Sequence, residues 1–230
     1  MNAETINNPV VVLISADGEW QTVVESLLPA ERQPSPFGEY FWHMVGLDKF
    51  VIFQSGWGKI AAASSTQYII DRFTPHLIIN IGTCGGFSGK VKQGEILLVN
   101  KTVVYDIVEQ MTDQDQALAT YTTDIDLGWI KIPYPLSVVE SILVSADQDI
   151  VPSSIPYLVE KFSAVAADWE SGAIAWVASK NNVRCLILRV VSDVVSVDGS
   201  PAYHSYEYFL QATKTYLPSI IKSLPQWLRQ

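Results

Sequence analysis

Two acidic residues, Glu170 and Asp193, are spaced so that both could act on one substrate. A predicted helix begins near Glu170, and a predicted buried strand that starts at Arg184 ends at Asp193. A helix of about 12 residues rises about 18 Å, and a strand of about 7 residues covers about 23 Å. If the two elements pack antiparallel, the start of the helix and the end of the strand meet at one edge of a sheet. Carboxyl groups at such an edge are candidates for acid–base chemistry, although either acid alone could simply cap a segment.

The order of hydrophobic segments predicts a single α/β domain that spans residues 1–230. Short β-branched runs are typical of strands buried on both faces, and segments with helical spacing follow most of them. The alternation of strands and helices favours a sheet covered by helices. The polar stretches 32–38 and 111–135 are expected to be loops. Strands are expected over 9–15, 40–45, 50–53, 77–81, 95–104, 142–145 and 184–193, and helices over 19–28, 59–73, 155–162, 170–178 and 206–224.

The composition argues against several classes of protein. The chain has 15 basic and 24 acidic residues, a net charge of −9 and no basic run, so nucleic acid is not expected as a partner. Hydrophobic residues make up 48% and charged residues 17%, which leaves apolar surface that oligomerisation would cover. Cys84 and Cys185 are expected to be reduced, and with three scattered histidines they form no metal-binding pattern. No signal peptide or membrane span is expected, which predicts a cytoplasmic protein.

Two glycine-rich segments follow predicted strands and could approach a ligand closely. Gly82–Gly86 and Gly56–Lys59 offer backbone N–H groups to an anion or a sugar, or they are ordinary turns. Neither matches a dinucleotide or P-loop motif, so no cofactor is expected. These two segments, together with Glu19, Asp147–Ile150 and Asp193, each come directly after a predicted strand. A largely parallel sheet would gather them on one side.

Three blocks of the chain form a recognisable set when they are taken in order. Residues 55–63 are Ser-Gly-Trp-Gly-Lys-Ile-Ala-Ala-Ala, residues 75–86 end in Asn-Ile-Gly-Thr-Cys-Gly-Gly, and residues 165–193 end in Arg-Val-Val-Ser-Asp. In order and spacing these blocks resemble those of the nucleoside phosphorylase superfamily, and specifically its 5'-methylthioadenosine/S-adenosylhomocysteine nucleosidases. The resemblance covers nearly all of the chain. It implies a central twisted mixed β-sheet flanked by helices in three layers, and cleavage of the N-glycosidic bond of an adenine nucleoside.

The resemblance also implies roles for residues at the base end of the substrate. Adenine is a poor leaving group until N7 is protonated, and Asp193 would be the general acid that protonates it. Ser192 would help to orient the base. The backbone of Asp149 and Ile150 would flank the purine.

Other residues are assigned by the resemblance to the sugar end. Glu170 falls where the glutamate of the family holds ribose hydroxyls, and Trp169 replaces a methionine beside the sugar. Thr83 matches a serine that would touch the ribose or the attacking water. Tyr206 aligns with an aromatic residue on the sugar side, and Trp57 of the glycine-rich segment is a further predicted substrate contact.

Hydrolysis requires a group that activates water, and here the chain departs from the family. The family places a glutamate four residues after the alanine of the first strand turn. Counted from Ala16, that position is Trp20, and Glu19 lies one residue early. We expect Glu19 to take this role, because a turn altered by Gly18 could bring its side chain to the same place.

Alternative functions stay open at this point. A phosphorylase would need arginines near the glycine-rich segments to hold phosphate, and none of the five arginines adjoins them in sequence, which favours water as the nucleophile. A nucleoside-binding protein without activity would explain the displaced glutamate. A nucleoside hydrolase of the menaquinone route, from the same superfamily, is a third candidate. The family and the apolar surface together predict a homodimer or a larger homo-oligomer that takes a small purine nucleoside.

Overall fold

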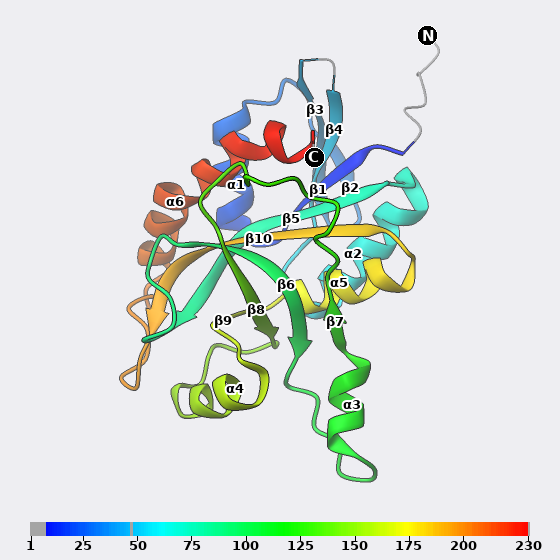
Figure 1. Cartoon of the computed structure of the whole chain (residues 1–230). Coiled ribbons are helices and arrows are strands. Elements are labelled where there is room, and N and C mark those ends of the chain that lie inside the picture. Colours follow the sequence, from blue (N-terminus) through cyan, green and yellow to red (C-terminus); the bar gives the residue numbers. More distant parts are fainter. Residues whose placement is uncertain (1–7, 47, 230) are drawn as a thin grey trace.

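The computed structural model describes residues 8–46 and 48–229. In these residues the strands of a mixed sheet alternate with helices along the chain (Figure 1). The N-terminal half contains β1 (Val10–Ile14), α1 (Asp17–Leu27), β2 (Gln33–Ser35), β3 (Gly38–Val45), β4 (Asp48–Gln54), α2 (Gly58–Phe73), β5 (Leu77–Phe87) and β6 (Ile96–Val104). The C-terminal half contains α3 (Gln114–Thr120), β7 (Thr122–Asp124), β8 (Val139–Ser145), a short 3-10 turn at Pro152–Ser154, α4 (Ile155–Phe162), β9 (Ala166–Asp168), α5 (Ser171–Lys180), β10 (Arg184–Val195) and α6 (Tyr206–Trp227).

Strand β5 is the centre of the sheet. It pairs in parallel with β1 and β10 and antiparallel with β9. Strand β6 connects β10 to β8, and β8 pairs with β9, so five strands close into a ring in the order β5, β10, β6, β8, β9. Strands β1, β4, β3 and β2 extend from β5 as an open sheet. The predicted α/β domain with a mixed central sheet is therefore confirmed.

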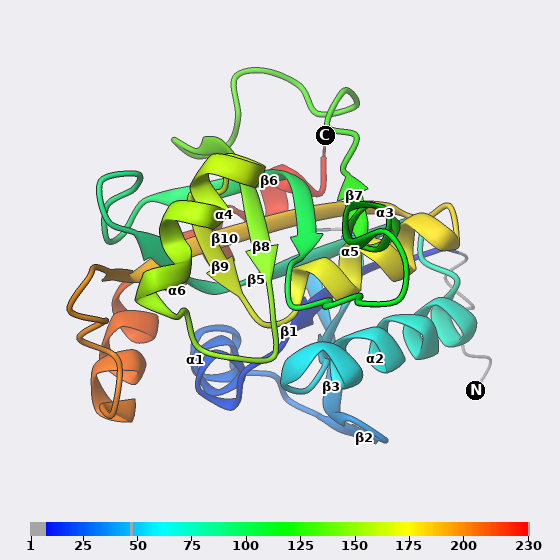
Figure 2. The same ribbon diagram turned by 90° about the horizontal axis from the view of Figure 1, so that it is seen from below.

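The helices form two layers because the buried strands are apolar on both faces. In β1, Val11 and Leu13 pack into one hydrophobic cluster, and Val12 and Ile14 pack into another. Successive side chains of a strand point to opposite faces, so each face of the sheet needs its own cover. Helices α2 and α5 pack together over the first cluster, and α1 and α6 pack together over the second (Figure 2).

The prediction that Gly82–Gly86 is a turn was wrong, because β5 continues to Phe87. In this stretch β5 pairs with β10, and Gly85 and Gly86 also pair with β9. A Cβ atom on Gly85 would lie 2.6 Å from Cδ1 of Ile150, and one on Gly86 would lie 2.6 Å from Cγ2 of Val91. The glycines thus let neighbouring side chains pack directly on the strand. In the sequence alone, glycines of this kind look the same as the glycines of a turn.

The two predicted loops also contain regular structure. Strand β2 pairs with β3 at the edge of the sheet, where Pro34 is tolerated because an edge strand needs fewer backbone donors. Within 111–135, α3 is capped by Asp113, whose side chain accepts hydrogen bonds from the N–H groups of Asp115 and Gln116. Strand β7 then pairs with β6. Both elements depend on a cap or a partner strand more than on a hydrophobic pattern.

The expectations about a signal peptide, membrane spans and the cysteines can be compared with the described residues only. Residues 1–7, which cover most of the segment searched for a signal peptide, lie outside the described part of the chain. In the described residues, no helix is long and apolar enough to cross a bilayer. Cys84 and Cys185 are both buried and free, as expected for reduced thiols.

Candidate active site

A cavity of about 640 Å³ lies where β1, β5 and β10 and the segment after β8 reach the same side of the sheet. Its wall also includes the starts of α1 and α6 and the junction of β9 with α5. All ten residues that the sequence assigned to a site line this cavity: Glu19, Trp57, Thr83, Asp149, Ile150, Trp169, Glu170, Ser192, Asp193 and Tyr206. The fold therefore brings together residues from almost the whole length of the chain.

Glu19, and not Trp20, faces the cavity. Its Oε1 accepts hydrogen bonds from the backbone N–H of Thr83 at 2.6 Å and from the Thr83 hydroxyl at 2.8 Å. Its Oε2 accepts from the N–H of Ala16 at 3.2 Å. Trp20 is buried in the opposite direction, with its ring centroid 5.6 Å from that of Phe41. Neighbouring helical residues point about 100° apart, so the packing of Trp20 in the core directs Glu19 to the cavity.

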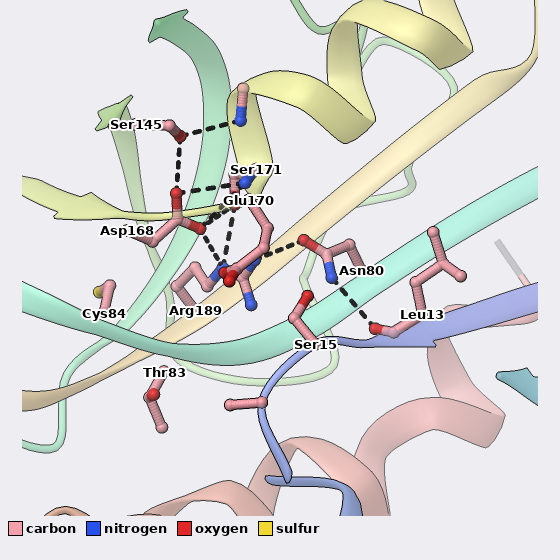
Figure 3. A network of polar contacts seen from close by, with 12 residues as sticks. Leu13, Ser15, Asn80, Thr83, Cys84, Ser145, Asp168, Glu170, Ser171 and Arg189 are labelled. Carbon is pink, nitrogen blue, oxygen red and sulfur yellow. Dashed lines mark hydrogen bonds and ion pairs between the residues drawn. The ribbon is translucent and has the colours of Figure 1, made fainter. Parts of the chain in front are cut away.

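A buried ion pair between Asp168 and Arg189 lies beside the cavity (Figure 3). Nε of Arg189 lies 2.8 Å from Oδ2 of Asp168 and also donates to the Ser171 hydroxyl at 3.0 Å. Nη2 of Arg189 donates to Oδ1 of Asn80 at 2.6 Å. The sequence showed no arginine next to a glycine-rich segment, but pairing of β10 with β5 places Arg189 opposite Gly82. Only the strand register reveals this neighbour.

Glu170 lies at the N-cap position of α5 and is almost fully buried. Its Oε1 accepts a hydrogen bond from the N–H of Gly58 at 3.0 Å. Burial, and after it the charges of Asp168 and Glu19, raise the pKa of Glu170 to about 8, although Arg189 and the hydrogen bond from Gly58 oppose the shift. The carboxyl group of Glu170 is therefore largely protonated at neutral pH.

Asp193 is directed into the cavity by an irregularity in β10. The pairing with β5 shifts register between Val191 and Asp193, so Ser192 is an extra residue in the strand. Alternate side chains of a regular strand share a face, and without this bulge Asp193 would point the same way as Val191, into the core. Oδ1 of Asp193 lies 2.6 Å from the Ser192 hydroxyl, and Oδ2 bonds the hydroxyl of Ser200. Two hydroxyl groups therefore hold this carboxyl in place.

Tyr203 lies at the same end of the cavity and was not predicted. Its hydroxyl donates a hydrogen bond to the carbonyl of Ile150. Burial raises the pKa of Tyr203, and the charges of Asp149 and Asp193 add to the shift, so the hydroxyl stays protonated. Tyr203 belongs to the segment between β10 and α6, where neither periodicity nor a motif pointed to a site residue.

Two pairs of aromatic rings line the cavity. Trp57 and Trp169 stack with ring centroids 4.6 Å apart and planes 24° apart. Tyr206 and Phe209 stack with centroids 5.8 Å apart. Trp57 is 66% and Tyr206 60% exposed. These rings form an apolar rim, whereas the carboxyl groups lie deeper in the protein.

The arrangement suits chemistry in which positive charge develops on a bound molecule. Glu19, Glu170 and Asp193 are all buried, and they face one cavity with different hydrogen-bond partners. Electrostatic interactions are stronger in such a buried setting than in water. One acid can donate a proton, another can accept one, and the third can contact hydroxyl groups. Cleavage of a glycosidic bond requires groups in these three roles.

Replacing Gly82 with alanine tests how tightly the charged groups pack. A Cβ atom there would lie 2.1 Å from Nη1 of Arg189 and 2.8 Å from Oε1 of Glu19. Because both groups are buried, we expect Gly82→Ala to lower the free energy of unfolding by about 1–3 kcal/mol. Urea denaturation measures the change. Gly128→Ala is the control, since its nearest neighbour is an oxygen of the exposed Asp126 at 3.1 Å. Equal stability of the two variants would contradict this packing.

Replacing Glu170 with glutamine tests its protonation. The folded pKa of about 8 lies above the ordinary value of 4.5, so the proton held by the folded state is lost on unfolding between these values. Wild-type stability attributable to this group should therefore fall as the pH rises from about 4.5 to about 8. Glu170→Gln should remove that decline, an effect on the order of a few kcal/mol. Urea denaturation across this range measures it. The stability curve of Glu160→Gln, which changes an exposed residue of α4, should run parallel to that of wild type. A curve for Glu170→Gln that is also parallel to wild type would contradict the raised pKa.

Comparison with known proteins shows which family the chain belongs to. The profile of the phosphorylase superfamily matches residues 9–224. A 5'-methylthioadenosine/S-adenosylhomocysteine nucleosidase of Maridesulfovibrio salexigens is 30% identical over 188 residues, which are 76% of this chain and 81% of that protein. The crystal structure of the corresponding nucleosidase of Helicobacter pylori with butyl-thio-DADMe-Immucillin-A aligns with a TM-score of 0.78 at 17% identity, over 96% of this chain and 99% of that one.

A second enzyme of the same organism has a similar fold. The futalosine hydrolase of Helicobacter pylori aligns with a TM-score of 0.78 at 18% identity, over 95% of this chain and 97% of that one. At such identities the structural likeness supports the fold alone, whereas the profile and the sequence relative carry the assignment. The chain belongs to the phosphorylase superfamily and, within it, to the family of the 5'-methylthioadenosine/S-adenosylhomocysteine nucleosidases.

Proposed function

We propose that this protein hydrolyses the N-glycosidic bond of a purine nucleoside, with 5'-methylthioadenosine or S-adenosylhomocysteine as the preferred substrate, and releases adenine. The observation that carries this proposal is the meeting of Glu19, Glu170 and Asp193 around one cavity of about 640 Å³. Membership of the nucleosidase family supports it. The cavity is large enough for a nucleoside, and its aromatic rim suits an apolar 5'-substituent.

Asp193 is the proposed general acid at the base. Its side chain is 6% exposed and is held by the hydroxyls of Ser192 and Ser200. Protonation of N7 by this carboxylic acid turns adenine into a neutral leaving group as the glycosidic bond breaks. The backbone of Ile150 and Asp149 flanks the purine in this arrangement, and the Tyr203 hydroxyl anchors that segment through the Ile150 carbonyl.

Glu170 is the proposed ligand of the ribose hydroxyls, with Trp169 against the sugar. The carboxyl holds a proton in the ligand-free protein, so it can donate to one hydroxyl and accept from another. As the bond breaks, the sugar becomes oxocarbenium-like. A carboxyl oxygen of Glu170 close to the developing positive charge would stabilise it.

Glu19 is the proposed base that activates water. The hydrogen bonds from Thr83 and Ala16 fix the Glu19 carboxylate in the first turn of α1. The remaining lone pairs of this carboxylate can accept a proton from water. Water that gives this proton to Glu19 attacks the anomeric carbon, and the pair of electrons in the glycosidic bond leaves with adenine. Glu19 supplies here what the family obtains from a glutamate one position later.

Water is favoured over phosphate as the nucleophile because internal carboxylates occupy the groups that would hold an anion. Both donors of Thr83 bond Glu19. At the N-terminus of α2, the N–H of Gly58 bonds Glu170. The guanidinium of Arg189 is paired with Asp168. A phosphate bound at these donors would have to displace carboxyl groups that already accept their hydrogen bonds, which costs free energy.

A product-release assay tests the reaction. Wild-type protein should release adenine from 5'-methylthioadenosine in phosphate-free buffer, and added phosphate should leave the rate unchanged. Asp193→Asn, which removes the proton donor, should lower kcat by at least about 100-fold. Glu19→Gln should have a similar effect because it removes the base. Glu160→Gln, which changes an exposed acid in the same way, should keep wild-type activity.

The same assay separates the alternatives. Strict dependence on phosphate would establish a phosphorylase. Binding of an adenosine analogue without turnover, unaltered by Asp193→Asn, would establish a nucleoside-binding protein. Faster release from futalosine than from either adenine nucleoside would establish a hydrolase of the menaquinone route. A panel of 5'-methylthioadenosine, S-adenosylhomocysteine, adenosine, inosine and futalosine, with and without phosphate, covers all of these outcomes.

We also propose that the protein is a homodimer whose partner covers the aromatic rim. Trp57 is 66%, Ile60 83% and Tyr206 60% exposed, and Trp57 and Tyr206 line the cavity. Exposed apolar groups around a binding site are typical of an interface. Light scattering after size-exclusion chromatography should give twice the monomer mass, and Ile60→Asp should shift the species towards the monomer. Elution of wild type as a monomer at micromolar concentration would contradict this proposal.

A further inference from the structure

Asp168 is the most heavily bonded carboxylate of the site, yet it has no part in the reaction described above. Its side chain is 4% exposed. Oδ1 accepts a hydrogen bond from the Ser145 hydroxyl at 2.6 Å, and both oxygens lie 3.2 Å from the N–H of Ser171. Oδ2 also bonds the Ser171 hydroxyl and the Nε of Arg189. Strands β8, β9 and β10 and helix α5 therefore meet at this one side chain (Figure 3).

Arg189 has a fixed orientation because its Nε and Nη2 groups both have buried partners. Nε is held by Asp168 and Ser171, and Nη2 is held by Asn80. Nη1 then extends over Gly82, 2.1 Å from the point where a Cβ atom would stand. The two Glu19 oxygens lie 2.8 and 2.9 Å from that same point, so Nη1 and Glu19 face each other across the bare glycine.

The charges in this region do not balance. Glu19, Asp168 and Glu170 supply three carboxyl groups, and Arg189 supplies the guanidinium that faces them. All four residues are buried. Full ionisation would bury three negative charges against one positive charge, which is costly, and a proton on one carboxyl reduces this imbalance. Asp168 and Glu19 each accept several hydrogen bonds, whereas Glu170 accepts one from Gly58 and is the member whose pKa is raised by burial.

From this arrangement we propose that Asp168 is a positioning residue of the reaction, which fixes Arg189 between Glu19 and Glu170 and thereby decides which of these carboxyls carries the proton. The proposal rests on the proposed hydrolysis and deepens it. While Asp168 holds Nε, the guanidinium cannot fold onto Glu19 as a full ion pair. Glu19 then keeps its capacity to accept a proton from water, and Glu170 keeps the proton with which it meets a ribose hydroxyl.

Asp168→Asn is the variant that tests this role, because asparagine retains the size and a carbonyl acceptor but loses the charge. We expect kcat to fall about 10- to 100-fold, with KM within about threefold of wild type, since the lost interaction acts on proton transfer more than on substrate binding. The transition of the pH–rate profile that belongs to Glu170 should also move to lower pH. Removing the charge of Asp168 and freeing Arg189 both favour the ionised form of Glu170.

Two further variants keep the test sharp. Asp113→Asn is the matched control, because Asp113, like Asp168, accepts hydrogen bonds from N–H groups at the start of a helix but lies outside the cavity. Its pH–rate profile should coincide with that of wild type. Ser171→Ala keeps the charge of Asp168 while it removes a hydroxyl that bonds both Asp168 and Arg189. It should lower kcat with little shift of the profile, and it serves if Asp168→Asn does not fold.

A double-mutant cycle makes the result independent of turnover. The change in stability caused by Glu170→Gln, followed with pH by urea denaturation, should depend on whether position 168 holds the native aspartate or carries Asp168→Asn. Wild-type protein without hydrolytic activity would contradict the proposed function, but this cycle would still report the coupling. An unchanged pH–rate profile and kcat in Asp168→Asn, or the absence of coupling in the cycle, would overturn the role of Asp168. Where Asp168→Asn does not fold, Ser171→Ala with wild-type kcat would overturn it.

Discussion

The buried ion pair between Asp168 and Arg189 is the interaction on which the rest of the site depends. Two charges can be buried together only when their hydrogen-bonding groups find partners, and here Ser145, Ser171 and Asn80 supply them. These partners belong to β8, α5 and β5, so the pair joins elements that the chain order keeps apart. Removing one partner of such a pair costs about 3–5 kcal/mol, because the other charge is left uncompensated.

The ion pair also explains how acidic groups can be concentrated without repelling one another out of the site. Arg189 is the cation that faces them, and the proton on Glu170 removes a further negative charge. Glu19 is stabilised in another way, by donors of Thr83 and Ala16. Each carboxyl group is therefore stabilised by different neighbours, and these different surroundings give chemically similar side chains different roles.

The closed ring of strands gives these groups a rigid frame. Strand β5 lies between β1, β9 and β10, and glycines on it let Arg189, Ile150 and Val91 pack directly against its backbone. The bulge at Ser192 turns Asp193 away from the core at the point where β10 passes the cavity. Such deviations from a regular strand are common near active sites, because they redirect one side chain while the ladder continues on both sides.

The sequence by itself determined most of the elements and the residues that would line the site. Apolar runs and helical spacing depend on local burial, and therefore β1, β5, β6, β10 and the long helices were predictable. The motif blocks and the resemblance built on them identified ten residues that all line the cavity. The sequence could not distinguish the glycines of a turn from those that accommodate a packed neighbour, and it could not decide between Glu19 and Trp20 from their order alone.

Only the tertiary structure decided those questions. Trp20 packs in the hydrophobic core, and Glu19 therefore points to the cavity. The register of β10 with β5 places Arg189 opposite Gly82, and the bulge at Ser192 turns Asp193 towards the cavity. The importance of Asp168 was also invisible, because its partners are Arg189, Ser171 and Ser145, and two of these come from other strands. Local patterns report which face of a segment is apolar. They do not report which buried charges meet, because that depends on contacts between residues far apart in the chain.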